Sequence, residues 1–122
     1  MSIENIRLSE KAKGQLITVK RYTKIENWNV LCRWALMLSL REPSIPPHEE
    51  INTNSNVEMT WKVFGGEFSD IYLALLKQRI YQDYGNVNKD ELHYHFKLHL
   101  HRGISYLLSK SKSIDELITL AL

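Results

Sequence analysis

The fold is decided by residues 28–40, Trp28-Asn29-Val30-Leu31-Cys32-Arg33-Trp34-Ala35-Leu36-Met37-Leu38-Ser39-Leu40. If this stretch forms a helix, apolar residues cover most of its circumference. Thr23 and Asn27 precede it, and either one is suited to cap the start of a helix. We therefore predict a helix over 28–40 that is covered on several sides, as a central core helix or as a subunit interface.

A second helix is expected just before this stretch. Residues 5–8 alternate apolar and polar side chains, which predicts a short strand or extended arm. Ser9 then stands as an N-cap for a helix over 10–22, where Ala12, Leu16 and Val19 form an apolar stripe. The N-terminal unit is thus an arm, a helix, a tight turn and a second helix.

The remainder of the chain predicts a loop, one strand and three helices. Three prolines predict a loop over 42–56. Alternating apolar and polar residues predict a strand over 57–64, which ends at Gly65-Gly66. Helical patterns cover 67–84 and, weakened by Gly103, 89–108, and Ser113 caps a last short helix. We expect a mainly α fold in one domain over 1–122: a compact helical domain with a short N-terminal extended arm, one short central strand and a ribbon-helix-helix-like N-terminal unit.

The composition is that of an ordinary globular protein. Hydrophobic residues make up 43% and charged residues 25% of the 122 residues. The first residues contain no continuous apolar run, so we expect neither a signal peptide nor a membrane partner, and a cytoplasmic location.

Positive charge is concentrated near the N-terminus. Residues 1–41 contain eight Lys/Arg and three Asp/Glu, a net +5, whereas residues 42–122 contain eight and eleven, a net −3. Lys13, Lys20 and Lys24 fall within roughly 40° of one line if the first helix continues to Lys24. Such a row suits the phosphates of duplex DNA, and the candidate DNA-binding residues are Arg7, Lys11, Lys13, Lys20, Arg21 and Lys24.

Two blocks of the sequence resemble the DndE family of DNA sulfur modification proteins. The first is Ile6-Arg7-Leu8-Ser9 followed by residues 29–40, and the second is Phe64-Gly65-Gly66-Glu67-Phe68 followed by Tyr72, Leu75, Leu76 and Arg79. The resemblance covers residues 3–80 and leaves the histidine-rich C-terminal third aside.

This resemblance implies a function in bacterial DNA phosphorothioate modification. It implies a non-catalytic accessory protein without a cofactor, which forms a homo-oligomer, a tetramer, and binds duplex DNA through surface lysines, with a preference for nicked DNA. Its implied protein partners are the modification proteins DndC and DndD.

Two other classes of function are compatible with the residues. An arm followed by two helices, with Asn5, Arg7 and Ser9 alternating, is also typical of a ribbon-helix-helix repressor that reads one operator. A sulfur-handling or metal-dependent enzyme is the other alternative. Such an enzyme would carry sulfur on Cys32 as a persulfide, or it would bind zinc through histidines. The histidines lie at i, i+4, i+8 spacing on two faces of one predicted helix, Glu91/His95/His99 and His93/Lys97/His101. We expect Cys32 to be a core residue and no metal site, because a third ligand is missing and Lys97 and Arg102 repel a cation.

Overall fold

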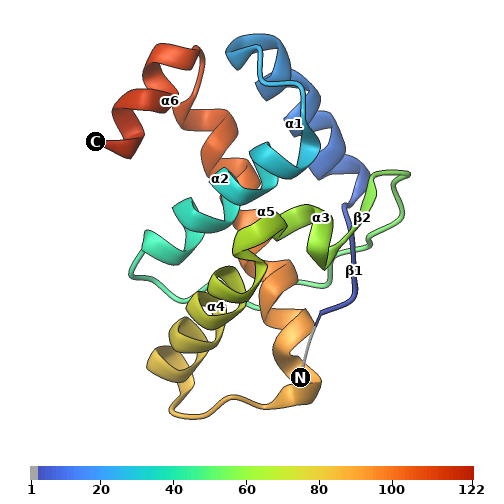
Figure 1. The fold of residues 1–122 in the computed structure, drawn as a ribbon, viewed down its shortest axis with the longest axis vertical. Coiled ribbons are helices and arrows are strands. Elements are labelled where there is room, and N and C mark those ends of the chain that lie inside the picture. Colours follow the sequence, from blue (N-terminus) through green and yellow to red (C-terminus); the bar gives the residue numbers. More distant parts are fainter. Residues whose placement is uncertain (1–2) are drawn as a thin grey trace.

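The computed structural model describes residues 3–122, which form a set of packed helices with one short two-stranded sheet at its edge (Figure 1). In chain order the elements are β1 Asn5–Arg7, α1 Glu10–Thr23, α2 Trp28–Arg41, β2 Glu58–Thr60, α3 Trp61–Gly65, a 3-10 turn Gly66–Phe68, α4 Ser69–Tyr84, a 3-10 turn Lys89–Glu91, α5 Leu92–Lys110 and α6 Ile114–Ala121. The predicted mainly α fold with one short central strand is confirmed.

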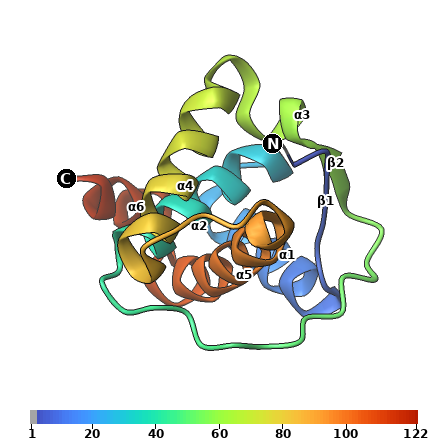
Figure 2. The same ribbon diagram turned by 90° about the horizontal axis from the view of Figure 1, so that it is seen from below.

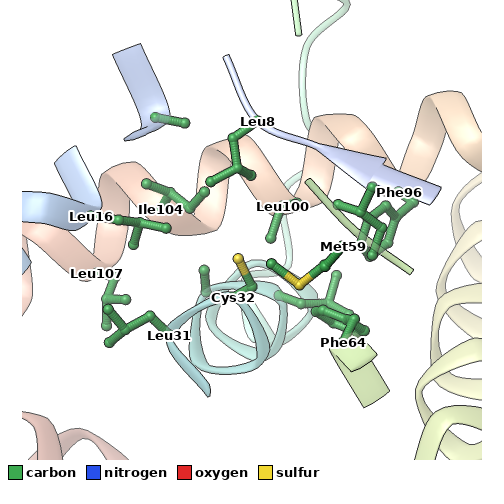
Figure 3. Close-up of a cluster of buried hydrophobic side chains, with 14 of the residues drawn as sticks. Leu8, Leu16, Leu31, Cys32, Met59, Phe64, Phe96, Leu100, Ile104 and Leu107 are labelled. Carbon is green, nitrogen blue, oxygen red and sulfur yellow. The ribbon is translucent and has the colours of Figure 1, made fainter. Parts of the chain in front are cut away.

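Helix α2 lies in the middle of the molecule. Leu31, Cys32, Ala35 and Leu36 on one face are fully buried. They pack with side chains from α1, α5, β2 and α3, as the close-up in Figure 3 shows. Helix α5 is the main partner of α2 and also packs against α1 (Figure 2). The apolar stretch over 28–40 is thus the central core helix on this face.

The N-terminal arm forms a strand within its own chain. β1 pairs antiparallel with β2, with Ile6 opposite Met59 and Arg7 opposite Glu58. Ile6 and Met59 point into the core, while Arg7 and Glu58 stand on the outer face. β1, α1 and α2 follow one another as predicted for the N-terminal unit.

The predicted strand over 57–64 is wrong in its second half, where the chain turns into helix α3. The Thr60 hydroxyl accepts a hydrogen bond from the Val63 N–H and so caps that helix. Trp61 and Phe64 are then buried three residues apart, while Val63 is 53% exposed. Buried and exposed residues alternate from 57 to 61, although residue 61 is already the first residue of α3. The alternation of the sequence therefore does not reveal where the strand ends.

The other predicted helices are found with small shifts at their ends. Single 3-10 turns occupy residues 66–68 and 89–91, so α4 and α5 begin two and three residues later than predicted. α5 runs through Gly103 without a break, and the Ser113 hydroxyl caps α6 by accepting from the Glu116 N–H.

The long connection over 42–56 is held in place by two arginines. Arg79 of α4, only 5% exposed, donates to the carbonyls of Leu40, Glu42, Pro43 and Ser44 and pairs with Asp83. Arg102 of α5 donates to Ser39 and Ser44. The loop therefore has defined backbone partners although it contains no regular element.

Candidate nucleic-acid interface

Helix α1 carries most of the predicted DNA-binding residues. The Ser9 hydroxyl accepts from the Ala12 N–H at 3.0 Å and starts the helix as predicted. Ala12, Leu16, Val19 and Thr23 are buried, which turns the remaining faces of α1 toward solvent.

Lys13 and Lys20 lie on one flank of α1, because seven residues bring the helix back to within about 20°. Each side chain has a partner there. The Lys13 Nζ donates to Asn56 Oδ1 at 2.7 Å, and the Lys20 Nζ lies 3.4 Å from the centre of the Trp28 ring. Partial burial lowers the pKa of Lys20, an effect that Glu26 opposes. These two lysines are held in defined positions on the side of α1 that faces α2 and β2.

The predicted row of three lysines ends at Lys20. Helix α1 stops at Thr23, and Lys24 takes a left-handed conformation with φ 65° as its C-cap. The condition for placing Lys24 on that line, a helix continuing to it, is therefore not met. Lys20, Arg21 and Lys24 instead form a cluster around the last turn, the cationic end of α1, where positive charge complements the helix dipole. Arg21 and Lys24 are exposed.

Arg7 and Lys11 lie apart from this cluster. The Arg7 guanidinium donates to Glu58 at 2.7 Å and to the Ser55 carbonyl at 3.0 Å, so its charge is already paired. Lys11 is exposed and lies about 160° around the helix from Lys13. The six predicted residues thus do not form one surface. Arg7 is paired with Glu58, Lys11 and Lys13 lie on opposite flanks of α1, and Lys20, Arg21 and Lys24 form the cationic end.

A groove of about 610 Å³ opens between Lys13, the start of α2 and β2. We call it the asparagine groove, because its lining includes Asn27, Asn29 and Asn56 beside Trp28. Glu26, Glu58, Val57, Met59 and Val63 complete it together with Lys13. Of these residues, the sequence pattern predicted only Lys13 as a DNA contact and Asn27 as a helix cap; the other lining residues carried no predicted functional role.

A second groove, of about 660 Å³, runs between α2, α4 and α6. We call it the apolar groove; Val30, Trp34, Met37, Leu75 and Leu120 are among its lining residues. Its charged lining residues are Arg33, Arg41 and Arg79, without a carboxylate. Met37 and Leu75 are 38% and 39% exposed. The apolar surface of α2 therefore continues outside the core.

The C-terminal histidines act as hydrogen-bonding residues of the fold. Nδ1 of the buried His99 lies 2.8 Å from the Ser39 hydroxyl, which accepts from Arg102. His101 accepts from the Ser9 N–H at Nε2 and donates to the Lys97 carbonyl at Nδ1, an arrangement that requires a neutral ring. Burial lowers the pKa of both rings, that of His99 to about 3. Within residues 3–122, no three His, Cys, Asp or Glu side chains gather in a way that would hold a metal ion.

Cys32 is fully buried in the core, as expected. Burial raises the pKa of its thiol to about 12, against the opposing effect of the cations Arg33 and Lys20. Because the thiolate is the reactive form, this environment disfavours persulfide chemistry.

The family model of the DNA sulphur modification protein DndE matches residues 5–115. The chain belongs to the DndE family. This membership extends the resemblance seen in residues 3–80 to residue 115, and it associates the chain with the DNA phosphorothioation system.

Solved DndE structures share this fold. The crystal structure of DndE from Escherichia coli B7A, involved in DNA phosphorothioation modification, is 22% identical, with a TM-score of 0.71 over 88% of this chain and 98% of that one. A glycine-to-lysine mutant of DndE is 19% identical, with a TM-score of 0.65 over 85% and 95% of the two chains. A search of curated proteins found no match. No helix of residues 3–122 has the length and apolar character needed to cross a bilayer.

Proposed function

We propose that this protein is a non-catalytic, cytoplasmic component of bacterial DNA sulfur modification that binds the backbone of duplex DNA, including nicked DNA. Membership of the DndE family is the observation that carries the proposal, and the arrangement of cations on α1 supports it. The DNA-binding residues of the proposal are Arg7, Lys11, Lys13, Lys20, Arg21 and Lys24. DndC and DndD are its proposed protein partners.

The cationic end of α1 is the main proposed contact with the DNA backbone. Arg21 and Lys24 are exposed, and Lys20 is oriented by the Trp28 ring. Cations at this spacing displace condensed counterions from neighbouring phosphates, which gives affinity without sequence preference. Arg7 contributes less free charge than the others because Glu58 neutralises it.

The proposed homo-oligomer, a tetramer, multiplies this weak contact. One short cationic cluster binds DNA weakly, whereas several copies held together bind with a higher effective concentration. The apolar groove supports assembly, because its lining has no carboxylate and includes exposed apolar side chains of α2 and α4. The exposed face of α6 offers a complementary surface on a second copy, since Ile114 and Ile118 stand there beside Asp115 and Glu116.

The backbone-binding proposal is tested by titration against intact and singly nicked duplexes of several sequences over a range of salt. We expect salt-sensitive, sequence-tolerant binding. The variant Arg21→Gln/Lys24→Gln is expected to flatten the log K against log salt slope by up to about 1.8, since each lost phosphate contact removes about 0.9. The control Lys77→Gln/Lys89→Gln removes the same charge from α4 and from the 3-10 turn Lys89–Glu91, and it is expected to keep the slope. Helix α4 lies at the far end of the molecule from the last turn of α1 (Figure 1). Equal slopes in all three proteins would remove Arg21 and Lys24 from the interface, and absence of binding at low salt would overturn the proposal.

Assembly is tested separately by light scattering coupled to size exclusion. We expect Met37→Glu/Leu75→Glu to shift the oligomer toward the monomer, because two carboxylates then stand in the apolar groove. Ile45→Glu changes a similarly exposed apolar residue in the 42–56 loop and is the matched control. A monomeric native protein would contradict the assembly proposal.

A further inference from the structure

The asparagine groove contains more amide groups than the fold uses. Asn29 Nδ2 donates to the Val63 carbonyl at 3.1 Å, and Asn56 Oδ1 accepts from Lys13. Asn27 stands at the N-cap of α2 but makes no side-chain capping bond there. The Asn29 carbonyl oxygen, the Asn56 amide N–H groups and the whole Asn27 amide remain for another partner.

The walls beside these amides suit a flat, uncharged ligand. The Trp28 ring, Val57 and Met59 line the groove, which has a volume of about 610 Å³. The Lys20 ammonium lies against the Trp28 ring and fixes its position. An aromatic side chain beside free amides is the combination by which proteins hold unstacked nucleobases, with stacking for affinity and amide groups on the base edges.

The charge of the lining favours a base over a phosphate. Lys13 stands against two carboxylates, Glu26 and Glu58, so the groove has no excess of positive charge. Arg7 pairs with Glu58 from outside the lining. The cations suited to phosphates are at the end of α1, next to the groove through the contact of Lys20 with Trp28.

We propose that the asparagine groove receives one unpaired nucleobase from a DNA strand whose backbone lies along the cationic end of α1. This inference rests on the proposed function and adds a site to it. Unstacking costs least for a base that is already unpaired, so the groove selects a strand end or a flap at a nick over a continuous duplex.

The test compares two nicked duplexes that differ in one base. One carries a single unpaired adenosine flap at the nick, and the other carries an abasic flap of equal charge. We expect the adenine flap to bind about fivefold tighter or more, as is usual for one stacked base. The variant Asn27→Ala/Asn56→Ala is expected to abolish this ratio, and the loop variant Asn52→Ala/Asn54→Ala to keep it. Equal affinity of the native protein for both flaps overturns the proposal.

A second measurement uses adenosine, which carries no phosphate, titrated to millimolar concentration against the isotope-labelled full chain. We expect NMR shifts in the Trp28 indole N–H and the side-chain amides of the groove, and none in the Asn27→Ala/Asn56→Ala variant. If no DNA binds but adenosine shifts these signals, the backbone-binding proposal fails together with the DNA strand of this inference, and only a nucleobase site in the groove stands. If duplexes bind while adenosine leaves the signals unmoved, the groove proposal fails and the backbone-binding proposal stands.

Discussion

Gly103 of α5 lies directly against Ala35 of α2. A Cβ built on Gly103 would lie 1.8 Å from the Ala35 carbonyl oxygen and 2.4 Å from its carbonyl carbon. Glycine is therefore required where the two central helices cross, although it weakens helix formation by about 1 kcal/mol relative to alanine. The glycine that weakened the predicted helix over 89–108 is what allows that helix to pack on α2.

We expect Gly103→Ala to lower the free energy of unfolding by about 1–3 kcal/mol or more, because backbone atoms of α2 have to move. Urea unfolding measures the loss. Gly14→Ala is the control, since Gly14 in α1 has no atom within 4 Å of an added Cβ and alanine favours the helix. That variant is expected to gain about 0.5–1 kcal/mol. A Gly103→Ala protein as stable as the native one would contradict the close crossing.

The core was predictable from the sequence because its signal is local and periodic. The stretch 28–40 and the stripe of Ala12, Leu16 and Val19 repeat at helical spacing, and the structure buries them. The change to a helix at Trp61 was not predictable by the same means, because the Thr60 cap acts within one turn and leaves the preceding alternation unchanged.

The asparagine groove could not be predicted because its parts have no common period. Lys13 and Asn56 are 43 residues apart and meet only because β1 pairs with β2. Nor does spacing reveal that Glu58 neutralises Arg7, or that α1 ends before Lys24. The candidate cations were identified from local charge, but which of them are free depends on tertiary contacts.

His99 makes the stability of the fold depend on pH. Burial, followed by the cations Arg102 and Arg79, lowers its pKa to about 3 from an ordinary value of 6.5. The unfolded chain therefore takes up a proton near pH 6.5 that the folded chain does not accept until about pH 3. The stabilisation is complete above pH 6.5 and is lost as the pH falls, by at most about 1.4 kcal/mol per pH unit.

Urea unfolding between pH 7 and pH 5 checks this expectation. The loss at pH 5 is expected to be about 2 kcal/mol from His99. His99→Asn is expected to reduce the pH dependence, whereas His93→Gln, on the exposed side of the same helix, serves as control. If the free energy of unfolding of His99→Asn fell with pH as steeply as that of the native protein, the acid sensitivity would belong to other groups.

Arg79 is expected to be the residue on which the 42–56 loop most depends. Its guanidinium donates to the carbonyls of Leu40, Glu42, Pro43 and Ser44 and pairs with the carboxylate of Asp83, whose side chain is 6% exposed. Arg79→Ala leaves these acceptors and a buried charge unpaired, which is expected to cost about 3–5 kcal/mol. Hydrogen exchange is expected to rise in residues 42–56 before the rest of the chain. Arg41→Ala removes an exposed guanidinium with one carbonyl partner, Leu120, and is expected to cost less than about 1 kcal/mol.

Cys32 provides the test that separates a binding protein from a sulfur-handling enzyme. Its thiol is buried and has a pKa raised to about 12, so at pH 8 the native protein holds very little thiolate. We expect reaction with a disulfide reagent at pH 8 to be at least about a hundredfold slower than in denaturing urea. Cys32→Ala is then expected to keep DNA phosphorothioation in cells, because the residue serves packing alone. Rapid native labelling together with loss of modification in Cys32→Ala would instead identify Cys32 as a sulfur carrier and overturn the proposal of a non-catalytic role.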